Sequence, residues 1–483
     1  MKHLKFLLLI LSFSIFSVHS KTWNDVSRLN SEEVSTIVKV RYQDDVVSAL
    51  KNLPQKFKVT ISGTRHSQGG HIVYPNAIVL DMTSFNKVVS ISPKEKMIVV
   101  QSGATWVIVQ EEANKFGLAV KVMQSSNIFS VGGSLSANVH GRDPRFGPLI
   151  ETVRSIKIAL ANGEVVLASR TVNPDLFFAA IGGYGLLGVI LEAEIELTDN
   201  QSLEKVTRKV SVQEYADALM YQAHELSLHY GRCSFVPGRS FLTECYSTNL
   251  KTNDLERTVS DLKPEQNIKR NSLLFSASRV SDLGKATRWK LQKELLDKPG
   301  QVSNIERNPA MQPAVRFLEY SSSEDTDILQ EYFIPIEKFS SFFGELSKEL
   351  ERYEVNLLSI TLRYLKENHE SYLAYAIDDM IAVVLYINIG LNDHSIAAAR
   401  EWTRKLVDIS LKHKGTYYLT YQRFPSLEQF QLTYPRWEKF MDVKCKYDPD
   451  EIFSSKFYEQ YLRAAYKKRM QLDKVPPARP LCR

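Results

Sequence analysis

Between residues 58 and 197, the pattern of hydrophobic and polar positions switches repeatedly between stretches typical of strands and stretches with helical spacing. The runs "KVTIS" (58–62), "AIVLDM" (77–82) and "KMIVVQSG" (96–103) are short, rich in β-branched residues and bounded by turn residues, which predicts strands. By contrast, "TWVIVQEEANKFG" (105–117) has apolar residues at helical spacing and predicts a helix closed by Gly117.

The next segment continues this alternation. "VRSIKIALANGEVVLAS" (153–169) predicts a hairpin with Asn162-Gly163 as its two-residue turn. "NPDLFFAAIGG" predicts a short helix that starts at Pro174 and ends in glycine, and "LGVILEAEIEL" (187–197) predicts a strand. Together these elements indicate an α+β domain.

From about residue 201 the elements become longer and glycine becomes rarer. The segments 339–354 and 395–415 carry apolar residues three and four positions apart, as in amphipathic helices that pack on a sheet. The strands predicted between them are "TDILQEYFIP", "LLSITLRYL" and "IAVVLYINIG". This part of the chain is interpreted as a second domain.

The first 20 residues have the pattern of a secretory signal peptide. Lysines precede an apolar run from Phe6 to Val18, and a small residue, Ser20, marks the expected cleavage position. A membrane anchor is the alternative, but the run falls short of the ~20 residues that a spanning helix needs. The protein is therefore expected to be exported, periplasmic or secreted. The proline-rich tail 472–483 is expected to be irregular.

Composition sets further limits. The 483 residues, 44% of them hydrophobic, can bury two cores, and the net charge of +6 is too weak to indicate a nucleic-acid partner. Four scattered cysteines without a C-x-x-C predict neither a zinc site nor a disulfide framework. Cys233 and Cys245 flank a Pro-Gly turn, and both a cross-hairpin disulfide and two separate buried thiols are compatible with that placement.

The segment 269–298 is locally basic. Its eight basic and three acidic residues give a net charge of +5, and Leu273, Leu274, Phe275 and Trp289 are interleaved with them. Such a segment is typical of peripheral contact with an anionic membrane surface. A solvated helix face that packs its apolar side inward is the alternative.

Three glycine-rich loops carry the candidate chemistry: "SGTRHSQGG" (62–70), "SSNIFSVGGSLSANVHGRDPRFG" (125–147) and "AAIGGYGLLGVI" (179–190). Glycines let successive backbone N–H groups converge on one anion. The first loop lacks both the Gly-Lys-Ser/Thr ending of a P-loop and the G-x-G-x-x-G spacing. All three loops fall in the first domain, where they can wrap one extended ligand with a pyrophosphate in its middle.

These loops, with "YPRWEKFMDVKCKYDPDEIFSS" near the end of the chain, resemble the vanillyl-alcohol oxidase superfamily of FAD-linked oxidoreductases. The chain is most similar to the decaprenylphosphoryl-ribose oxidase, aldonolactone oxidase and alditol oxidase group, and more distantly to cytokinin dehydrogenases. The resemblance implies an α+β, two-subdomain FAD-binding fold of the vanillyl-alcohol oxidase type with an α+β substrate cap. The expected boundaries are an FAD-binding domain at 21–200, a cap at 201–433, and a returning segment at 434–471.

The resemblance also implies which residues hold FAD. They are Ser62, Gly63, Thr64, Arg65, His66, Ser67, Ser126, Gly132, Gly133, Ser136, Asn138, His140, Gly188 and Ile190. His66 matches the histidine of covalently flavinylated alditol and aldonolactone oxidases, which predicts a bond to the 8α-methyl group of the flavin. The alternative is that His66 only hydrogen-bonds a phosphate or the backbone.

Hydride transfer to flavin requires a group that takes the hydroxyl proton. Glu331 and Arg363 are charges inside apolar strands and are candidates, although they can instead pair with each other across the sheet. Gln422 stands where the ribose oxidase type carries its catalytic lysine, and a glutamine cannot act as an acid or base. This difference leaves His140, Glu331 or the neighbouring Arg423 to handle the proton.

The function expected from these features is oxidation of a C–OH group of a sugar, polyol or sugar-derived small molecule. Oxygen or another carrier would reoxidise the flavin. Two alternatives remain: C–N oxidation of the cytokinin dehydrogenase kind, and a non-catalytic flavin-binding electron-transfer protein. No metal site is expected.

Overall fold

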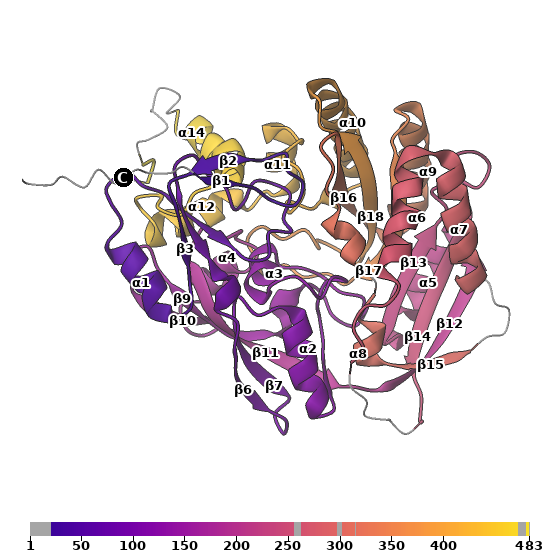
Figure 1. The fold of residues 1–483 in the computed structure, drawn as a ribbon, viewed down its shortest axis with the longest axis horizontal. Helices are drawn as coiled ribbons and strands as arrows, with labels where there is room; N and C mark the ends of the chain where they lie inside the picture. Colours follow the sequence, from indigo (N-terminus) through magenta and orange to yellow (C-terminus); the bar gives the residue numbers. More distant parts are fainter. Residues whose placement is uncertain (1–20, 256–261, 297–301, 314, 472–479, 483) are drawn as a thin grey trace, which may run out of the picture.

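The computed structural model describes residues 21–255, 262–296, 302–313, 315–471 and 480–482. The predicted signal peptide and most of the predicted irregular tail lie outside these residues. Figure 1 shows an N-terminal domain on the left and a cap domain on the right. Among the described helices, none is long and apolar enough to cross a membrane.

Six antiparallel strands form the main sheet of the N-terminal domain. The strand order is β10–β9–β11–β7–β6, with β8 paired to the far end of β11, and every pairing is antiparallel. The strands are β6 (Val88–Ser92), β7 (Met97–Gln101), β8 (Leu118–Val120), β9 (Val153–Ala159), β10 (Val165–Ser169) and β11 (Val189–Asp199). Helices α2 (Trp106–Lys115), α3 (Val131–Ala137) and α4 (Pro174–Ala180) belong to the same domain.

A second, parallel sheet completes this domain. Its order is β3 (Thr36–Lys39), β5 (Ile78–Asp81) and β4 (Val59–Ser62), with α1 (Gln43–Lys51) between β3 and β4 in the chain. A short hairpin of β1 (Lys21–Trp23) and β2 (Glu32–Val34) precedes it. The glycine-rich loop 62–70 therefore leaves the end of a buried parallel strand.

The C-terminal segment returns to the N-terminal domain. Val59 forms a parallel bridge with Phe453, and the helices α12 (Trp437–Tyr447) and α14 (Ala464–Arg469) lie beside the first strands (Figure 1). The buried Lys444 ammonium donates to the carbonyls of Leu186 and Phe453, at 2.7 Å each, and pairs with Asp448. Burial lowers the pKa of Lys444, and Asp448 opposes that shift.

The cap domain is built on one antiparallel sheet of eight strands. Their order is β15–β12–β14–β13–β17–β18–β16–β19. The strands are β12 (Ser202–Val210), β13 (Leu228–Cys233), β14 (Cys245–Thr252), β15 (Ser303–Glu306), β16 (Asp325–Pro335), β17 (Leu357–Leu365), β18 (Met380–Gly390) and β19 (Thr416–Tyr417). Its longer helices are α5 (Val212–Gln222), α6 (Ile268–Val280), α7 (Asp282–Leu296), α9 (Phe339–Arg352) and α10 (Asp393–Lys412).

Alternation along β16 separates the two faces of the cap sheet. Tyr332 is buried against Phe342 of α9, with ring centroids 6.1 Å apart. Because successive side chains point to opposite faces, Glu331 points away from α9. The face that carries Glu331 turns toward the N-terminal domain.

The predicted 153–169 hairpin is present, but its turn is wider than expected. The Leu160 N–H donates to the Glu164 carbonyl, so three residues lie between the closing pair. A two-residue type I′ turn needs positive φ at both central positions, and here only Gly163 has it (φ 80°). The side chain of Asn162 instead accepts from the Glu164 N–H at 2.9 Å.

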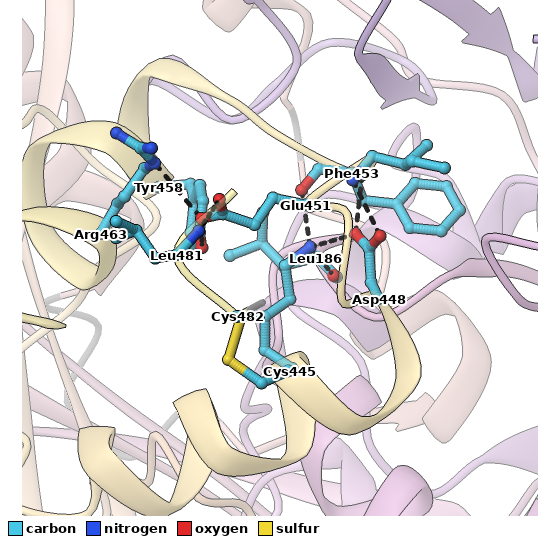
Figure 2. Close-up of a disulfide and its surroundings, with 11 residues drawn as sticks. Leu186, Cys445, Asp448, Glu451, Phe453, Tyr458, Arg463, Leu481 and Cys482 are labelled. Carbon is cyan, nitrogen blue, oxygen red and sulfur yellow. Dashed lines mark hydrogen bonds and ion pairs between the residues drawn. A yellow bond between two sulfur atoms is a disulfide. The ribbon is translucent and has the colours of Figure 1, made fainter. Parts of the chain in front are cut away.

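All four cysteines are paired in disulfides, so the expectation that they form no framework is wrong. Cys233 and Cys245 are direct cross-strand partners on β13 and β14, which decides for the bridge over two separate thiols. Cys445 on α12 pairs with Cys482, 37 residues later (Figure 2). The second pair could not be found from spacing, because only the fold brings the chain end back onto α12.

Candidate functional site

A cavity of about 720 Å³ lies between the two domains. The loop after β4, the helix α3 and the loop before β11 line its N-terminal side. Strands β13, β16, β17 and β18 with helices α6 and α7 line its cap side. Fourteen of the predicted site residues line it: Gly63, Thr64, Arg65, His66, Ser67, Ser126, Gly132, Gly133, Ser136, His140, Gly188, Ile190, Glu331 and Arg363.

The loop 63–67 presents unpaired donors to this cavity. Its backbone N–H groups donate to no acceptor among the described residues, and Arg65 takes a left-handed conformation (φ 63°). The buried hydroxyls of Ser102 and Ser125 also line the cavity and lack a described partner. Concave sets of unpaired N–H and O–H donors suit a pyrophosphate, so this part of the chain fits an FAD.

We call this donor set, residues 63–67 with Ser102 and Ser125, the FAD cradle. Close backbone packing supports its wall. The Gly132 N–H donates to the Ser102 carbonyl at 2.7 Å, and a Cβ added at Gly132 would come within 2.7 Å of the Ser102 Cβ. Glycine at 132 therefore lets α3 approach the strand end at Ser102. A larger side chain there would push α3 into the cavity.

His66 is held at the edge of the cradle. Its ring stacks on Phe129, with centroids 4.3 Å apart, and its Nδ1 lies 3.1 Å from the Thr64 hydroxyl. Burial, with a smaller contribution from Arg65, lowers the pKa of His66 to about 4. The imidazole is consequently neutral at pH 7 and keeps a nucleophilic nitrogen, as a covalent flavin bond requires; that bond stays a prediction.

On the cap side, Glu331 pairs with His140. Glu331 Oε1 lies 2.6 Å from His140 Nε2, its Oε2 accepts from the Tyr421 hydroxyl at 3.1 Å, and both members of the pair are 2% exposed. Burial alone would raise the pKa of Glu331, but His140 and Arg363 outweigh it and hold that pKa below its usual value. His140 Nδ1 has no described partner.

Arg363 does not pair directly with Glu331, although that was the structural alternative. β18 separates their strands, with Val384 opposite Glu331 and Ala382 opposite Arg363. Ser359, Thr361 and Arg363 alternate toward the cavity along β17. Arg363 thus faces the same cavity as Glu331 and acts on it through the electric field.

Two of the predicted catalytic residues, Gln422 and Arg423, do not line the cavity. The Arg423 guanidinium donates to Gln460 Oε1 at 2.7 Å and to Asn30 Oδ1 at 3.0 Å. It ties the C-terminal segment to the N-terminal domain, and Gln422 is buried beside it. The geometry therefore gives neither residue contact with a substrate in this cavity.

Ser62 and Asn138, both predicted to bind FAD, also lie off the cavity. The Ser62 hydroxyl donates to the next carbonyl at 3.3 Å. Asn138 ends α3 in a left-handed conformation (φ 47°), and its side chain accepts from the Ile150 N–H at 2.9 Å. Both shape the loops that hold the cradle.

Sequence reasoning missed four arginines on the cavity wall: Arg142, Arg232, Arg288 and the exposed Arg270. In the sequence, Arg270 and Arg288 belong to a basic segment, and Arg142 belongs to a glycine-rich loop. A signal existed for Arg232, which stands in the strand sequence "LHYGRC". A charge at one position of an otherwise half-buried strand indicates either a partner or a ligand.

The described part of the basic segment, 269–296, forms the antiparallel pair α6 and α7. Trp289 is buried and donates to Glu244 at 2.8 Å. Contrary to the expectation for a membrane-binding segment, this tryptophan is therefore not available to a membrane. Leu273, Leu283 and Leu295 are each more than 70% exposed. Peripheral membrane contact through this hairpin stays a prediction, now resting on its leucines and lysines. Across the described ranges, no three His, Cys, Asp or Glu side chains are placed to hold a metal ion.

Two segments of the chain match known protein families. Residues 34–169 match the FAD binding domain family, and residues 301–462 match the D-arabinono-1,4-lactone oxidase family. The chain is 34% identical over 146 residues to a putative D-arabinono-1,4-lactone oxidase of Neurospora crassa, covering 30% of this chain and 26% of the relative. It is 32% identical over 146 residues to decaprenylphosphoryl-beta-D-ribose oxidase of Mycolicibacterium smegmatis, covering 30% and 32%.

A third relative is cytokinin dehydrogenase 9 of Oryza sativa subsp. japonica, 37% identical over 142 residues, covering 29% of this chain and 27% of the relative. Each of these matches spans only about a quarter to a third of the relative. The chain belongs to the vanillyl-alcohol oxidase superfamily of FAD-binding oxidoreductases. Its cofactor is FAD, and its fold is the α+β fold of that superfamily.

Proposed function

We propose that the protein oxidises a C–OH group of a sugar, polyol or sugar-derived small molecule. The observation that carries the proposal is the buried His140–Glu331 pair, which opens onto the same cavity as the FAD cradle. When bound, FAD accepts the two electrons released at the carbon. The chain must then supply a group for the hydroxyl proton.

The His140–Glu331 pair has the parts of a general base. In the neutral tautomer whose Nε2–H donates to Glu331, Nδ1 carries the lone pair that takes a proton. The carboxylate fixes that tautomer and stabilises the imidazolium that forms. Tyr421, which donates to the other carboxylate oxygen, keeps Glu331 oriented toward His140.

Oxidation at C–OH is favoured over oxidation at C–N by the part of the chain that faces the substrate. The match to the D-arabinono-1,4-lactone oxidase family covers 301–462, which includes β16, β17 and β18 of the cavity wall. A non-catalytic role is disfavoured because a buried carboxylate on a cavity wall, that of Glu331, is costly unless it is used.

We also propose that the protein acts outside the cytoplasm and passes electrons to oxygen or another carrier. The two disulfides support an oxidising compartment. Fractionation of the source cells, followed by mass mapping of unreduced protein, tests this part.

The function is tested by mixing FAD-loaded protein anaerobically with sugars, polyols, aldonolactones and amines. Loss of the oxidised flavin absorbance with a sugar-type alcohol supports the proposal, and loss only with amines supports C–N oxidation. An oxidised spectrum throughout the panel would favour the non-catalytic alternative. Stopped-flow reoxidation with air then measures whether oxygen is the acceptor.

A further inference from the structure

Four arginines converge on the cap side of the cavity, and we call them the arginine cluster: Arg142, Arg232, Arg288 and Arg363. They come from four different elements, namely the loop after α3, β13, α7 and β17, and all line the cavity. None of them forms an ion pair with a described carboxylate. Two carboxylates that act on them, Glu331 and Asp327, are already paired with His140 and Arg279.

Arg288 shows the lack of partners for these buried cations most clearly. Its side chain is 2% exposed, yet Nε, Nη1 and Nη2 all lack a hydrogen-bond partner among the described residues. The guanidinium carbon lies 4.3 Å from the centre of the Phe235 ring and 3.9 Å from that of Phe275. Stacking on rings fixes the plane of a guanidinium and leaves its edge, with its N–H fork, for a ligand.

The neighbours make this region more positive still. Burial and the adjacent Arg363 and Arg232 lower the pKa of Arg142 to about 9, and burial with Arg232 does the same for Arg288. Burial would raise the pKa of Tyr230, but Lys205, Arg142 and Arg232 outweigh it and hold that pKa below its usual value. Buried cations without counter-ions are destabilising, so a fold keeps them where an anion binds.

We propose that the arginine cluster binds an anionic group, a carboxylate or a phosphate, carried by the substrate at a distance from the carbon that is oxidised. The substrate would then be a sugar acid or a sugar phosphate rather than a neutral sugar or polyol. Guanidinium forks match the geometry of both oxyanions. The statement that a substrate carries the anion rests on the proposed function. The anion site itself does not depend on that function.

The site is tested first without turnover. Tm of the FAD-loaded protein is measured with inorganic phosphate or acetate, against sodium chloride at equal ionic strength. We expect at least one of the two anions to raise Tm, and we expect Arg288→Met and Arg232→Gln to lose that increase. Arg208→Gln, an exposed arginine on β12 of the same sheet, is the matched control and should keep it. No increase with either anion, or an equal increase in all variants, overturns the proposal.

Arg288→Met has a second readout that a structural role would not give. Because it removes a buried cation that has no partner, it should raise Tm by about 2 °C or more in the absence of anion. A salt-bridged structural arginine would lower Tm when removed. Lowered Tm in Arg288→Met, together with an undiminished response to both anions, would count against the cluster.

The substrate class is tested with glucose, glucuronate and glucose 6-phosphate, which share one ring and differ in charge. We expect either anionic member to bleach the flavin at concentrations about 10- to 100-fold lower than glucose, with the advantage lost in Arg288→Met. Equal bleaching of the flavin by all three sugars overturns the substrate inference while leaving C–OH oxidation intact. Anion-dependent stabilisation without bleaching by these sugars or by any alcohol of the wider panel would leave the cluster standing and overturn the proposed function.

Discussion

His140 Nε2 and Glu331 Oε1 lie 2.6 Å apart, although 191 residues separate them in the chain. His140 comes from the loop that follows α3 in the FAD-binding domain, and Glu331 comes from β16 of the cap sheet. The hydrogen bond therefore crosses the boundary between the two domains. The general base is therefore complete only where the cap and the FAD-binding domain meet.

Glu331→Gln should lower the rate of flavin bleaching by about 10²- to 10⁴-fold, because an amide cannot stabilise the imidazolium of His140. Its FAD content should stay normal, since Glu331 faces the cap side of the cavity. Glu337→Gln, an exposed carboxylate in the same segment, is the control. A bleaching rate within threefold of the unmodified protein would exclude this pair from proton transfer.

His66 is predicted to hold the flavin covalently. After denaturation in acid and filtration, flavin colour should stay with the polypeptide, and His66→Ala should release it into the filtrate. His224→Ala, on an exposed side chain of the cap, should retain it. Full release of flavin from the unmodified protein would show that His66 makes only non-covalent contacts.

Gly132→Val should yield folded protein with little bound FAD, because the new side chain would meet the Ser102 backbone and displace α3. The ratio of flavin absorbance to protein absorbance measures the loss. Gly344 on α9 has open space around its Cβ position, so Gly344→Val is the matched control with normal FAD content. Equal flavin ratios in both variants would remove α3 from the cofactor wall.

The disulfides should differ in what they contribute to stability. Replacing Cys445 and Cys482 by serine opens a loop of 37 residues and should cost up to about 4 kcal/mol; the loop of 12 between Cys233 and Cys245 should cost up to about 3 kcal/mol. Urea unfolding of the two double variants measures both. The ordering would be contradicted if the short-loop variant were the less stable one.

Stability should fall as the pH drops from about 6.5 toward 4. Burial lowers the pKa of His66 and His229 to about 4 and that of His71 to about 3, with Arg65 and Arg423 adding to the shifts of His66 and His71. The unfolded chain takes up these protons below about pH 6.5, whereas the folded chain does not, so falling pH favours unfolding.

His71→Phe keeps an aromatic ring between Tyr184 and Phe457 while removing one of these protons. The dependence of the unfolding free energy on pH should become shallower by about 1.4 kcal/mol per pH unit between pH 6 and 5. His224→Gln is the control. An unchanged slope in His71→Phe would mean that His71 is protonated in the folded protein.

The strands and helices could be predicted because their side-chain periods are local properties. Glu331 was singled out for the same reason, since a charge inside "LQEYFIP" violates the apolar pattern of its strand. Its partner could not be derived, because the pairing depends on how two domains meet. Nothing near residue 331 in the sequence points to residue 140.

Arg288 shows a second limit of prediction from sequence, which concerns the burial of a single helical residue. In the sequence it is one of several basic residues in a helical segment, and Lys290 beside it is exposed. Only the packing of α7 over the cap sheet distinguishes a buried arginine between two phenylalanine rings from a solvated lysine two positions away. Burial of that kind depends on the rotation of a helix, which a mixed basic and apolar pattern does not fix.

The parallel bridge between Val59 and Phe453 also sets an order of events during synthesis. The strand that leads into the flavin loop pairs at Val59 with Phe453, a residue that is synthesised 394 positions later. At translation rates of about 5–20 residues per second, that interval is about 20–80 s. The nascent chain therefore spends most of its synthesis without the segment that pairs with the strand before the flavin loop.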